Sequence, residues 1–151
     1  MSLKTRLGED MKDAMRERES GKFRLSVIRM VRAAIKYAEI EARRELGEEE
    51  VVSVLAKEVK MRRDSFAEFT KGNRPDLAQQ AQREIDILLA YMPKQLTVDE
   101  VRSLVAEAVR ETGAASPKDM GKVMAFLAPR IKGRADGKQV SGLVQETLGG
   151  K

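Results

Sequence analysis

The sequence predicts an all-α protein, in which an N-terminal four-helix unit precedes a small C-terminal three-helix domain. Apolar residues recur at helical spacing along almost the whole chain. Glycines and prolines fall between the periodic segments. Charged residues make up 35% of the 151 residues and aromatic residues 4%, which is typical of helices with heavily solvated faces.

The first two helices are predicted over residues 3–20 and 23–45, on either side of Gly21. The apolar face of the first helix consists of Leu3, Leu7, Met11, Ala14 and Met15. That of the second consists of Phe23, Val27, Ile28, Val31, Ala34, Ile35, Ala38 and Ala42. Leu46 and Gly47 are expected to end the second helix, because glycine favours the position just after a helix C-terminus.

The third and fourth helices follow the same logic. The third begins at the acidic run Glu48–Glu50, because negative charge is favourable at a helix N-terminus, and it ends near residues 71–72. The fourth has Pro75 in its first turn and ends at residues 91–93. Their inward faces consist of Val51, Val52, Val54, Leu55, Val59, Phe66, Phe69, Leu77, Ala81, Ile85, Leu88 and Leu89.

Pro93 is the predicted boundary between the two domains, which are assigned to residues 1–92 and 97–148. The residue before a proline is disfavoured in helical geometry, so the fourth helix should break at Met92. The charge differs across this boundary. Residues 1–92 contain 19 cations and 17 anions, whereas the remainder contains 10 cations and 7 anions.

Three helices are predicted after the boundary. The fifth begins with a capping box from Thr97 to Glu100 and ends at Gly113. Ser116 caps the sixth, Pro117 takes its first position, and Pro129 is expected to end it. Asp136 caps the seventh. Their apolar residues are Val101, Leu104, Val105, Ala108, Val109, Met120, Val123, Met124, Leu127, Val140, Leu143, Val144 and Leu148.

Most of the net charge lies in residues 116–138, here called the basic segment. It carries six cations against two anions, or +4, while the whole chain is +5. Backbone amides of its loop 132–138 could cradle an anion, and an arginine there could grip a phosphate bidentately. The predicted nucleic-acid-binding residues are Lys118, Lys122, Arg130, Lys132, Gly133, Arg134, Gly137 and Lys138. The same residues also fit a purely structural role, in which the glycines turn the chain and Asp136 caps a helix.

Composition excludes several kinds of chemistry. The chain has no Cys and no His, so it lacks thiol nucleophiles, histidine acid–base catalysis and the usual zinc ligands. Gly133 and Gly137 are too close for a Walker A loop. We therefore predict no catalytic residue, no metal and no cofactor. Few aromatic residues disfavour base stacking and favour recognition of a nucleic-acid backbone.

Two further expectations concern location. No segment approaches the roughly 20 apolar residues that a membrane span needs, so no membrane partner is predicted. The absence of cysteine agrees with a reducing compartment, and a cytoplasmic location is predicted.

Five strings in the chain together resemble the GatB/YqeY family: RLSVIRM from Arg24, EEVVSVLAKEVKMRRDS from Glu49, YMPKQL from Tyr91, DMGKVM from Asp119 and KGRADGK from Lys132. The resemblance covers essentially the whole chain. It implies that the C-terminal domain is similar to the tail of the B subunit of the glutamine-dependent aspartyl/glutamyl-tRNA amidotransferase. In that enzyme the helical tail engages tRNA, and the catalytic chemistry resides in other domains.

Three hypotheses of function follow. The first is a non-catalytic tRNA-binding or amidotransferase-related accessory protein, with tRNA and amidotransferase or aminoacyl-tRNA synthetase components as partners. The second is a protein-interaction adaptor that uses the N-terminal helices. The third is participation in carbon–nitrogen ligase activity with glutamine as amido-N-donor, although the serines show no lysine–serine motif of the amidase kind.

Overall fold

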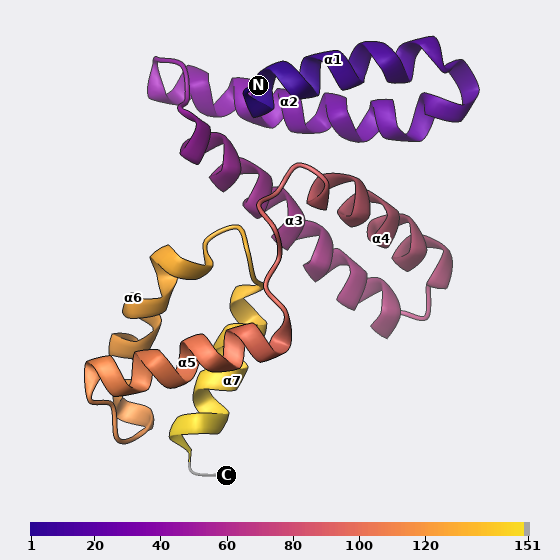
Figure 1. Ribbon diagram of the computed structural model, residues 1–151. Coiled ribbons are helices and arrows are strands. Elements are labelled where there is room, and N and C mark those ends of the chain that lie inside the picture. The colour runs from indigo at the N-terminus through magenta and orange to yellow at the C-terminus, as the bar shows by residue number, and fades with distance from the viewer. Residues whose placement is uncertain (150–151) are drawn as a thin grey trace. The chain divides into compact units, whose positions relative to one another are not determined.

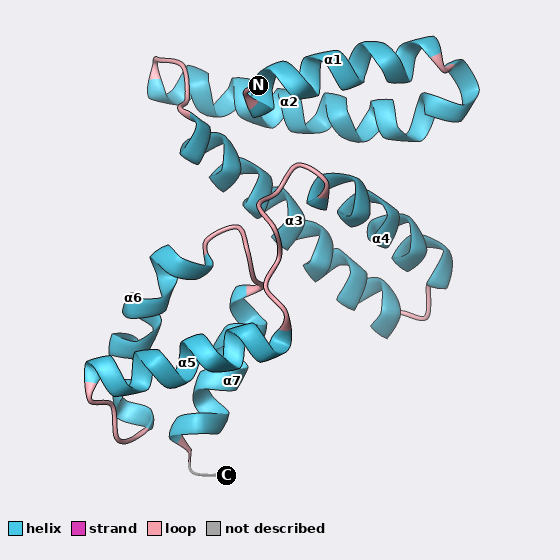
Figure 2. Cartoon of the chain, viewed as in Figure 1, coloured by secondary structure: helices cyan, strands magenta, loops and turns pink. Residues whose placement is uncertain are grey.

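The computed structural model describes residues 1–149, which form seven α-helices and two short 3₁₀ helices without a strand in that range (Figures 1 and 2). This confirms the all-α fold class. The elements are α1 (Leu3–Arg16), η1 (Arg18–Gly21), α2 (Lys22–Ala42), α3 (Glu48–Lys71), α4 (Pro75–Leu89), α5 (Val98–Thr112), η2 (Pro117–Asp119), α6 (Met120–Ile131) and α7 (Gly137–Leu148).

The chain divides into two compact units, of which the first ends at Met92 and the second begins at Pro93. That each unit is a separate domain remains a prediction. In the first unit α1 lies beside α2 and α3 beside α4, so two helical hairpins share one core (Figure 1). This core consists of Leu7, Val27, Ile28, Val31, Ile35, Val51, Leu55, Val59, Ile85, Leu88 and Tyr91.

The turn between α1 and α2 differs from the prediction. The first helix was expected to reach residue 20, but α1 ends at Arg16 and a 3₁₀ turn follows. Arg18 takes a left-handed conformation, with φ of 55°. Gly21 is buried so tightly against the backbone of Ala14 that a Cβ there would overlap the Ala14 carbonyl. The turn after Arg16 therefore brings the main chain of Gly21 directly against that of Ala14.

Two other predicted helix ends are wrong. α2 stops at Ala42, before the expected Leu46, because Arg43 is left-handed with φ of 57°. α6 does not stop at Pro129 but continues to Ile131. A proline removes one hydrogen bond but keeps a helical φ, and the Lys132 N–H still donates to the Ala128 carbonyl at 3.2 Å.

Arg62 forms a buried ion-pair cluster between α3 and α4. Its Nη1 donates to Glu58 Oε1 at 2.9 Å and its Nε donates to Glu84 Oε1 at 3.0 Å. The heavily solvated helix faces that the composition predicts do not include Arg62, which is only 7% exposed. Two carboxylates from different helices thus compensate one buried cation.

Tyr91 follows the end of α4 and is buried in the core of the first unit. Its hydroxyl donates to Asp10, and the guanidinium of Arg6 lies 4.6 Å from the centre of its ring. Burial, and then the hydrogen bond to Asp10, raise the pKa of Tyr91, so the phenol stays protonated and remains a donor. The end of α4 is therefore tied to α1.

The second unit packs α5, α6 and α7 around a separate core. This core consists of Val101, Val105, Ala108, Val123, Leu127, Ile131, Val140, Leu143, Val144 and Leu148. The predicted capping box is confirmed, because the Glu100 N–H donates to Thr97 Oγ1 at 3.1 Å and the Thr97 N–H to Glu100 Oε1 at 2.9 Å. None of the helices in residues 1–149 combines the length and the apolar character that a bilayer span requires.

Candidate nucleic-acid interface

The six cations of the basic segment lie at both ends of α6. Lys118 and Lys122 lie at its N-terminal end, in η2 and the first turn. Arg130 and Lys132 lie at its C-terminal end, Arg134 follows in the loop, and Lys138 is in the first turn of α7. Lys122 and Arg130 are separated by about 12 Å along the helix axis. The structure thus divides the predicted site into two groups, of which only the C-terminal group is dense in charge.

The N-terminal group is partly neutralised by Asp119. Its Oδ1 lies 3.7 Å from Lys122 Nζ, and its Oδ2 accepts the Ala115 N–H at 2.9 Å. The hydrogen bond from Ala115 is the main cause that lowers the pKa of Asp119, so this carboxylate is ionised at neutral pH. The pair weakens the attraction of Lys122 for a phosphate.

In the C-terminal group, the Arg130 side chain stacks on Phe126, a residue that was not among the predicted site residues. The guanidinium lies 3.7 Å from the centre of the Phe126 ring and donates to the Phe126 carbonyl at 2.6 Å. Lys122, Phe126 and Arg130 follow one another at intervals of four residues and share one helix face. That spacing is a sequence signal that could have revealed the pair.

Residues 94–96, here called the anchor segment, hold the loop 132–138 in place. The Leu96 N–H donates to the Arg134 carbonyl at 2.8 Å. Gln95 Nε2 donates to the Gly133 carbonyl at 2.8 Å, and Arg134 Nε donates to the Lys94 carbonyl at 3.2 Å. The strings YMPKQL and KGRADGK, which lie far apart in the sequence, therefore meet in the second unit.

The anchor segment also brings its own charge to the loop. The pKa of Glu100 is lowered mainly by its hydrogen bonds with Thr97. The positive charges of Lys94 and Arg134 lower it further, so both cations lie near the same carboxylate. Lys94 is exposed, and it carries no ion pair in the part of the chain that is described. It is a further cation at this end of α6 that was not among the predicted site residues.

The backbone amides of the loop are largely used inside the protein. The N–H groups of Arg134 and Ala135 donate to the Ile131 carbonyl at 2.8 and 3.1 Å. That of Lys138 donates at 3.1 Å to Asp136 Oδ1, so Asp136 caps α7 as predicted. These three amides are not available to cradle an anion. Binding of an anion here would depend on side chains.

The glycines of the segment differ in what they require. Gly133 is left-handed, with φ of 72°. A Cβ at Gly121 or Gly137 would meet nothing within 4 Å. Within residues 1–149, no three carboxylates gather in a group that could hold a metal ion.

This difference makes a prediction about two identical substitutions. Gly133→Ala should destabilise the second unit by about 1–2 kcal/mol, the cost of a side chain in the left-handed region. Gly137→Ala should be neutral or stabilising, because the new methyl group meets open space. Urea denaturation of the two variants checks this, and equal midpoints would contradict it.

Comparison with known proteins adds the family. A family model described as "Yqey-like protein" matches residues 4–148. Similar relatives include three proteins that are each named "Altered inheritance of mitochondria protein 41, mitochondrial". The one from Pyrenophora tritici-repentis is 34% identical over 149 residues, which cover 97% of this chain and 81% of the relative. The one from Lachancea thermotolerans is 28% identical over 141 residues, covering 89% and 74%. The one from Kluyveromyces lactis is 38% identical over 86 residues, covering 56% and 45%.

The names of these relatives correct one prediction. They describe mitochondrial proteins, which contradicts the cytoplasmic location expected from the sequence. The absence of cysteine was the only basis for that expectation, and it does not distinguish one reducing compartment from another.

Proposed function

Because this chain belongs to the family of Yqey-like proteins, we propose that it is a non-catalytic tRNA-binding or amidotransferase-related accessory protein. It engages the tRNA backbone through the C-terminal end of α6 and the loop that follows. Lys118, Lys122 and Lys138 extend the contact along the basic segment. Gly133 and Gly137 belong to the loop that presents these cations.

One observation carries this proposal. Arg130, Lys132 and Arg134 lie within five residues of each other, and none of the three forms an ion pair with a described carboxylate. Arg44, Arg62 and Arg74 of the first unit, in comparison, are paired with acids. Cations that gather at one place without ion pairs attract a polyanion, because binding releases the counterions condensed on it.

The geometry favours phosphate contacts over base reading. The Phe126 ring is covered by the Arg130 guanidinium, so this face of it is not open to a base. Nη1 of Arg130 bonds the Phe126 carbonyl, and the stacking fixes the plane of the guanidinium over the ring. A preorganised guanidinium loses little freedom when it meets a phosphate, so affinity should depend weakly on RNA sequence.

The test is binding of labelled tRNA to the full chain at several salt concentrations. Replacing Arg130, Lys132 and Arg134 together by glutamine should weaken binding about tenfold or more. It should also reduce the slope of log affinity against log salt by about one for each lost phosphate contact. Both effects should be similar for unrelated tRNA sequences.

A matched variant controls for net charge. Lys57, Arg102 and Arg110 are exposed and unpaired within residues 1–149, so replacing them by glutamine removes as many charges from elsewhere. Its affinity and salt slope should stay close to those of the natural protein. Equal weakening in both triple variants, or binding that does not respond to salt, would overturn the proposal.

Of the two other hypotheses, the adaptor role is supported by the exposed apolar side chains of Met30, Tyr37 and Ile40 on α2. Participation in carbon–nitrogen ligase activity with glutamine as amido-N-donor remains a prediction without support. Ser53, on α3, donates its hydroxyl to the Glu49 carbonyl of the same helix and not to a general base.

A further inference from the structure

α2 has a second apolar face that the first unit leaves largely exposed. Its core face consists of Val27, Ile28, Val31 and Ile35. Met30, Ala33, Tyr37 and Ile40 lie on another side, within an arc of about 80° at 100° per residue. Met30 is 51% exposed, Tyr37 69% and Ile40 64%. A surface helix needs only one apolar stripe for its own core, so a second one indicates a contact with something else.

The spacing of this second face is that of a coiled-coil seam. The intervals from Met30 to Ala33, Tyr37 and Ile40 are three, four and three residues, which are the intervals between a and d positions of a heptad. The stripe runs over two heptads of a 21-residue helix. A seam of this kind is completed by one partner helix, packed lengthwise along it.

The charge beside the seam specifies the partner. Arg29 and Lys36 are seven residues apart along one edge of the stripe, and Arg43, seven residues further on, directly follows the last residue of α2 in a left-handed conformation. In a coiled coil this edge is the g position, which faces charged residues of the partner helix. None of these three cations forms an ion pair or hydrogen bond with a described residue. A partner with carboxylates at the facing positions would pair Arg29 and Lys36, and Arg43 adds a positive charge just beyond the end of the helix.

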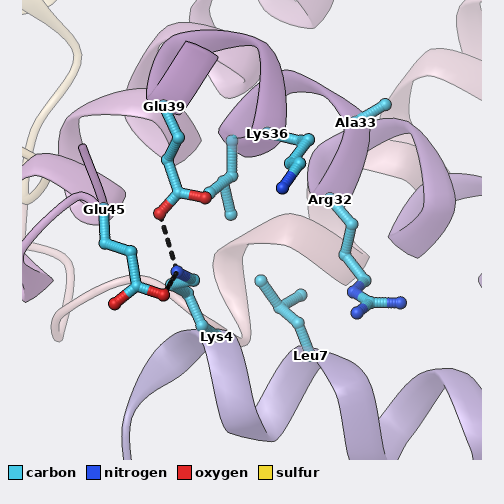
Figure 3. A pocket seen from close by; sticks show the side chains of 8 residues that line it. Lys4, Leu7, Arg32, Ala33, Lys36, Glu39 and Glu45 are labelled. Carbon is cyan, nitrogen blue, oxygen red and sulfur yellow. Dashed lines mark hydrogen bonds and ion pairs between the residues drawn. The ribbon is translucent and has the colours of Figure 1, made fainter. Parts of the chain in front are cut away.

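A cavity next to the same edge of α2 also favours an acidic partner. It has a volume of about 520 Å³ and lies between α1 and α2, with Ala33 and Lys36 in its lining (Figure 3). Leu7 and Ile35 supply buried apolar surface. Lys4 lies between two carboxylates, 2.7 Å from Glu39 and 4.0 Å from Glu45, so its charge is already compensated (Figure 3). Two other cations line this cavity without an ion pair to a described carboxylate: Lys36, and Arg32, whose Nη1 donates to Met11 Sδ at 2.9 Å.

We infer that the exposed face of α2 binds an amphipathic helix of a partner protein whose flanking residues are acidic. Large aliphatic residues of that helix, such as leucine, pack on Met30, Tyr37 and Ile40. Its carboxylates pair with Arg29 and Lys36, and Arg43 adds a positive charge just beyond the end of α2. One carboxylate side chain reaches Lys36 at the rim of the cavity. This surface is independent of the tRNA contact proposed above, which uses the second unit.

A second copy of this chain fits the face less well. The edge opposite the cations carries Ala34 and Glu41. If two α2 helices paired in parallel, the three cations of each would meet one carboxylate; if they paired antiparallel, cations would face cations. Either arrangement leaves most of these charges uncompensated, so an acidic partner is favoured over self-association.

The inference is tested with the full chain and two synthetic helical peptides of 21 residues. Both have leucine at positions a and d; one has glutamate at e and g, and the other has lysine there. We expect the acidic peptide to bind at least tenfold more tightly than the basic one. Tyr37→Ala with Ile40→Ala should weaken the acidic peptide about tenfold or more, as loss of an interface centre does.

Charge reversal makes the test specific. Arg29→Glu, Lys36→Glu and Arg43→Glu together should invert the preference, so that the basic peptide binds more tightly. The glutamine variant of Arg130, Lys132 and Arg134 should bind the acidic peptide normally, since it alters only the second unit. Circular dichroism melts of each variant show whether the fold is retained, and all of the substituted side chains are exposed or in the loop.

Three results would overturn the inference. The first is equal affinity of the natural protein for both peptides. The second is an α2-dependent dimer in light scattering that Tyr37→Ala abolishes, which assigns the face to a second copy. The third is loss of tRNA affinity on reversal of the three α2 cations with no effect on peptide binding, which assigns the face to RNA.

Discussion

Arg62→Leu is expected to lower the free energy of unfolding of the first unit by about 3–5 kcal/mol, the usual cost of breaking a buried ion pair. The substitution leaves Glu58 and Glu84 without their shared cation, although their side chains are only 13% and 17% exposed. Two like charges then lie close together in a region with little water. Urea denaturation followed by circular dichroism measures the change.

Two comparisons separate this mechanism from general damage to α3. Lys60→Leu breaks an exposed ion pair with Asp64 at 3.2 Å on the same helix, and it should cost less than about 1 kcal/mol. Adding Glu58→Leu and Glu84→Leu to Arg62→Leu should restore much of the lost stability, because no uncompensated charge remains. A triple variant less stable than Arg62→Leu alone would contradict this explanation.

Gly21→Ala is expected to destabilise the first unit by about 3 kcal/mol or more, at the upper end of the cost of forcing an added methyl group into a packed site. The new Cβ would overlap the carbonyl of Ala14, which belongs to the main chain and cannot move by a change of rotamer. The α1–α2 hairpin would have to open. Thermal melts and urea denaturation should both report the loss.

Gly8→Ala is the matched control, since Gly8 lies in α1 and a Cβ there would meet nothing within 4 Å. It should be neutral or stabilise the protein by up to about 1 kcal/mol, the difference in helix propensity. Ala14→Gly should not rescue Gly21→Ala, because the overlap is with the backbone of residue 14. Full recovery in that double variant would show that the side chain of Ala14, and not its carbonyl, is the obstacle.

The helices could be predicted because each has one continuous apolar face at helical spacing. Their ends were harder, since Arg18 and Arg43 adopt left-handed conformations that sequence rules reserve for glycine or asparagine. The burial of Arg62 was missed because its other partner, Glu84, lies 22 residues away on another helix. A pattern along the chain reports local neighbours, and contacts between helices lie outside it.

In the basic segment, too, local features could be predicted from the sequence, whereas contacts between distant residues could not. Its cations and the cap at Asp136 could be read from the sequence, and the cap is confirmed. Whether the cations gather depends on α6, because its helical turns lie between Lys122 and Arg130 and keep them apart. The hydrogen bonds from Gln95 to Gly133 and from Leu96 to Arg134 join residues 38 positions apart, and no periodicity predicts them.

The anchor segment has a consequence for how the second unit can be excised. A fragment that starts at Thr97 keeps all three helices and their core, yet it omits Lys94, Gln95 and Leu96. The carbonyls of Gly133 and Arg134 then lose their donors, and the Arg134 side chain loses its acceptor. In such a fragment the loop 132–138 would no longer be held in place by the anchor segment. A fragment that starts at Pro93 would keep these hydrogen bonds and the native positions of the loop cations.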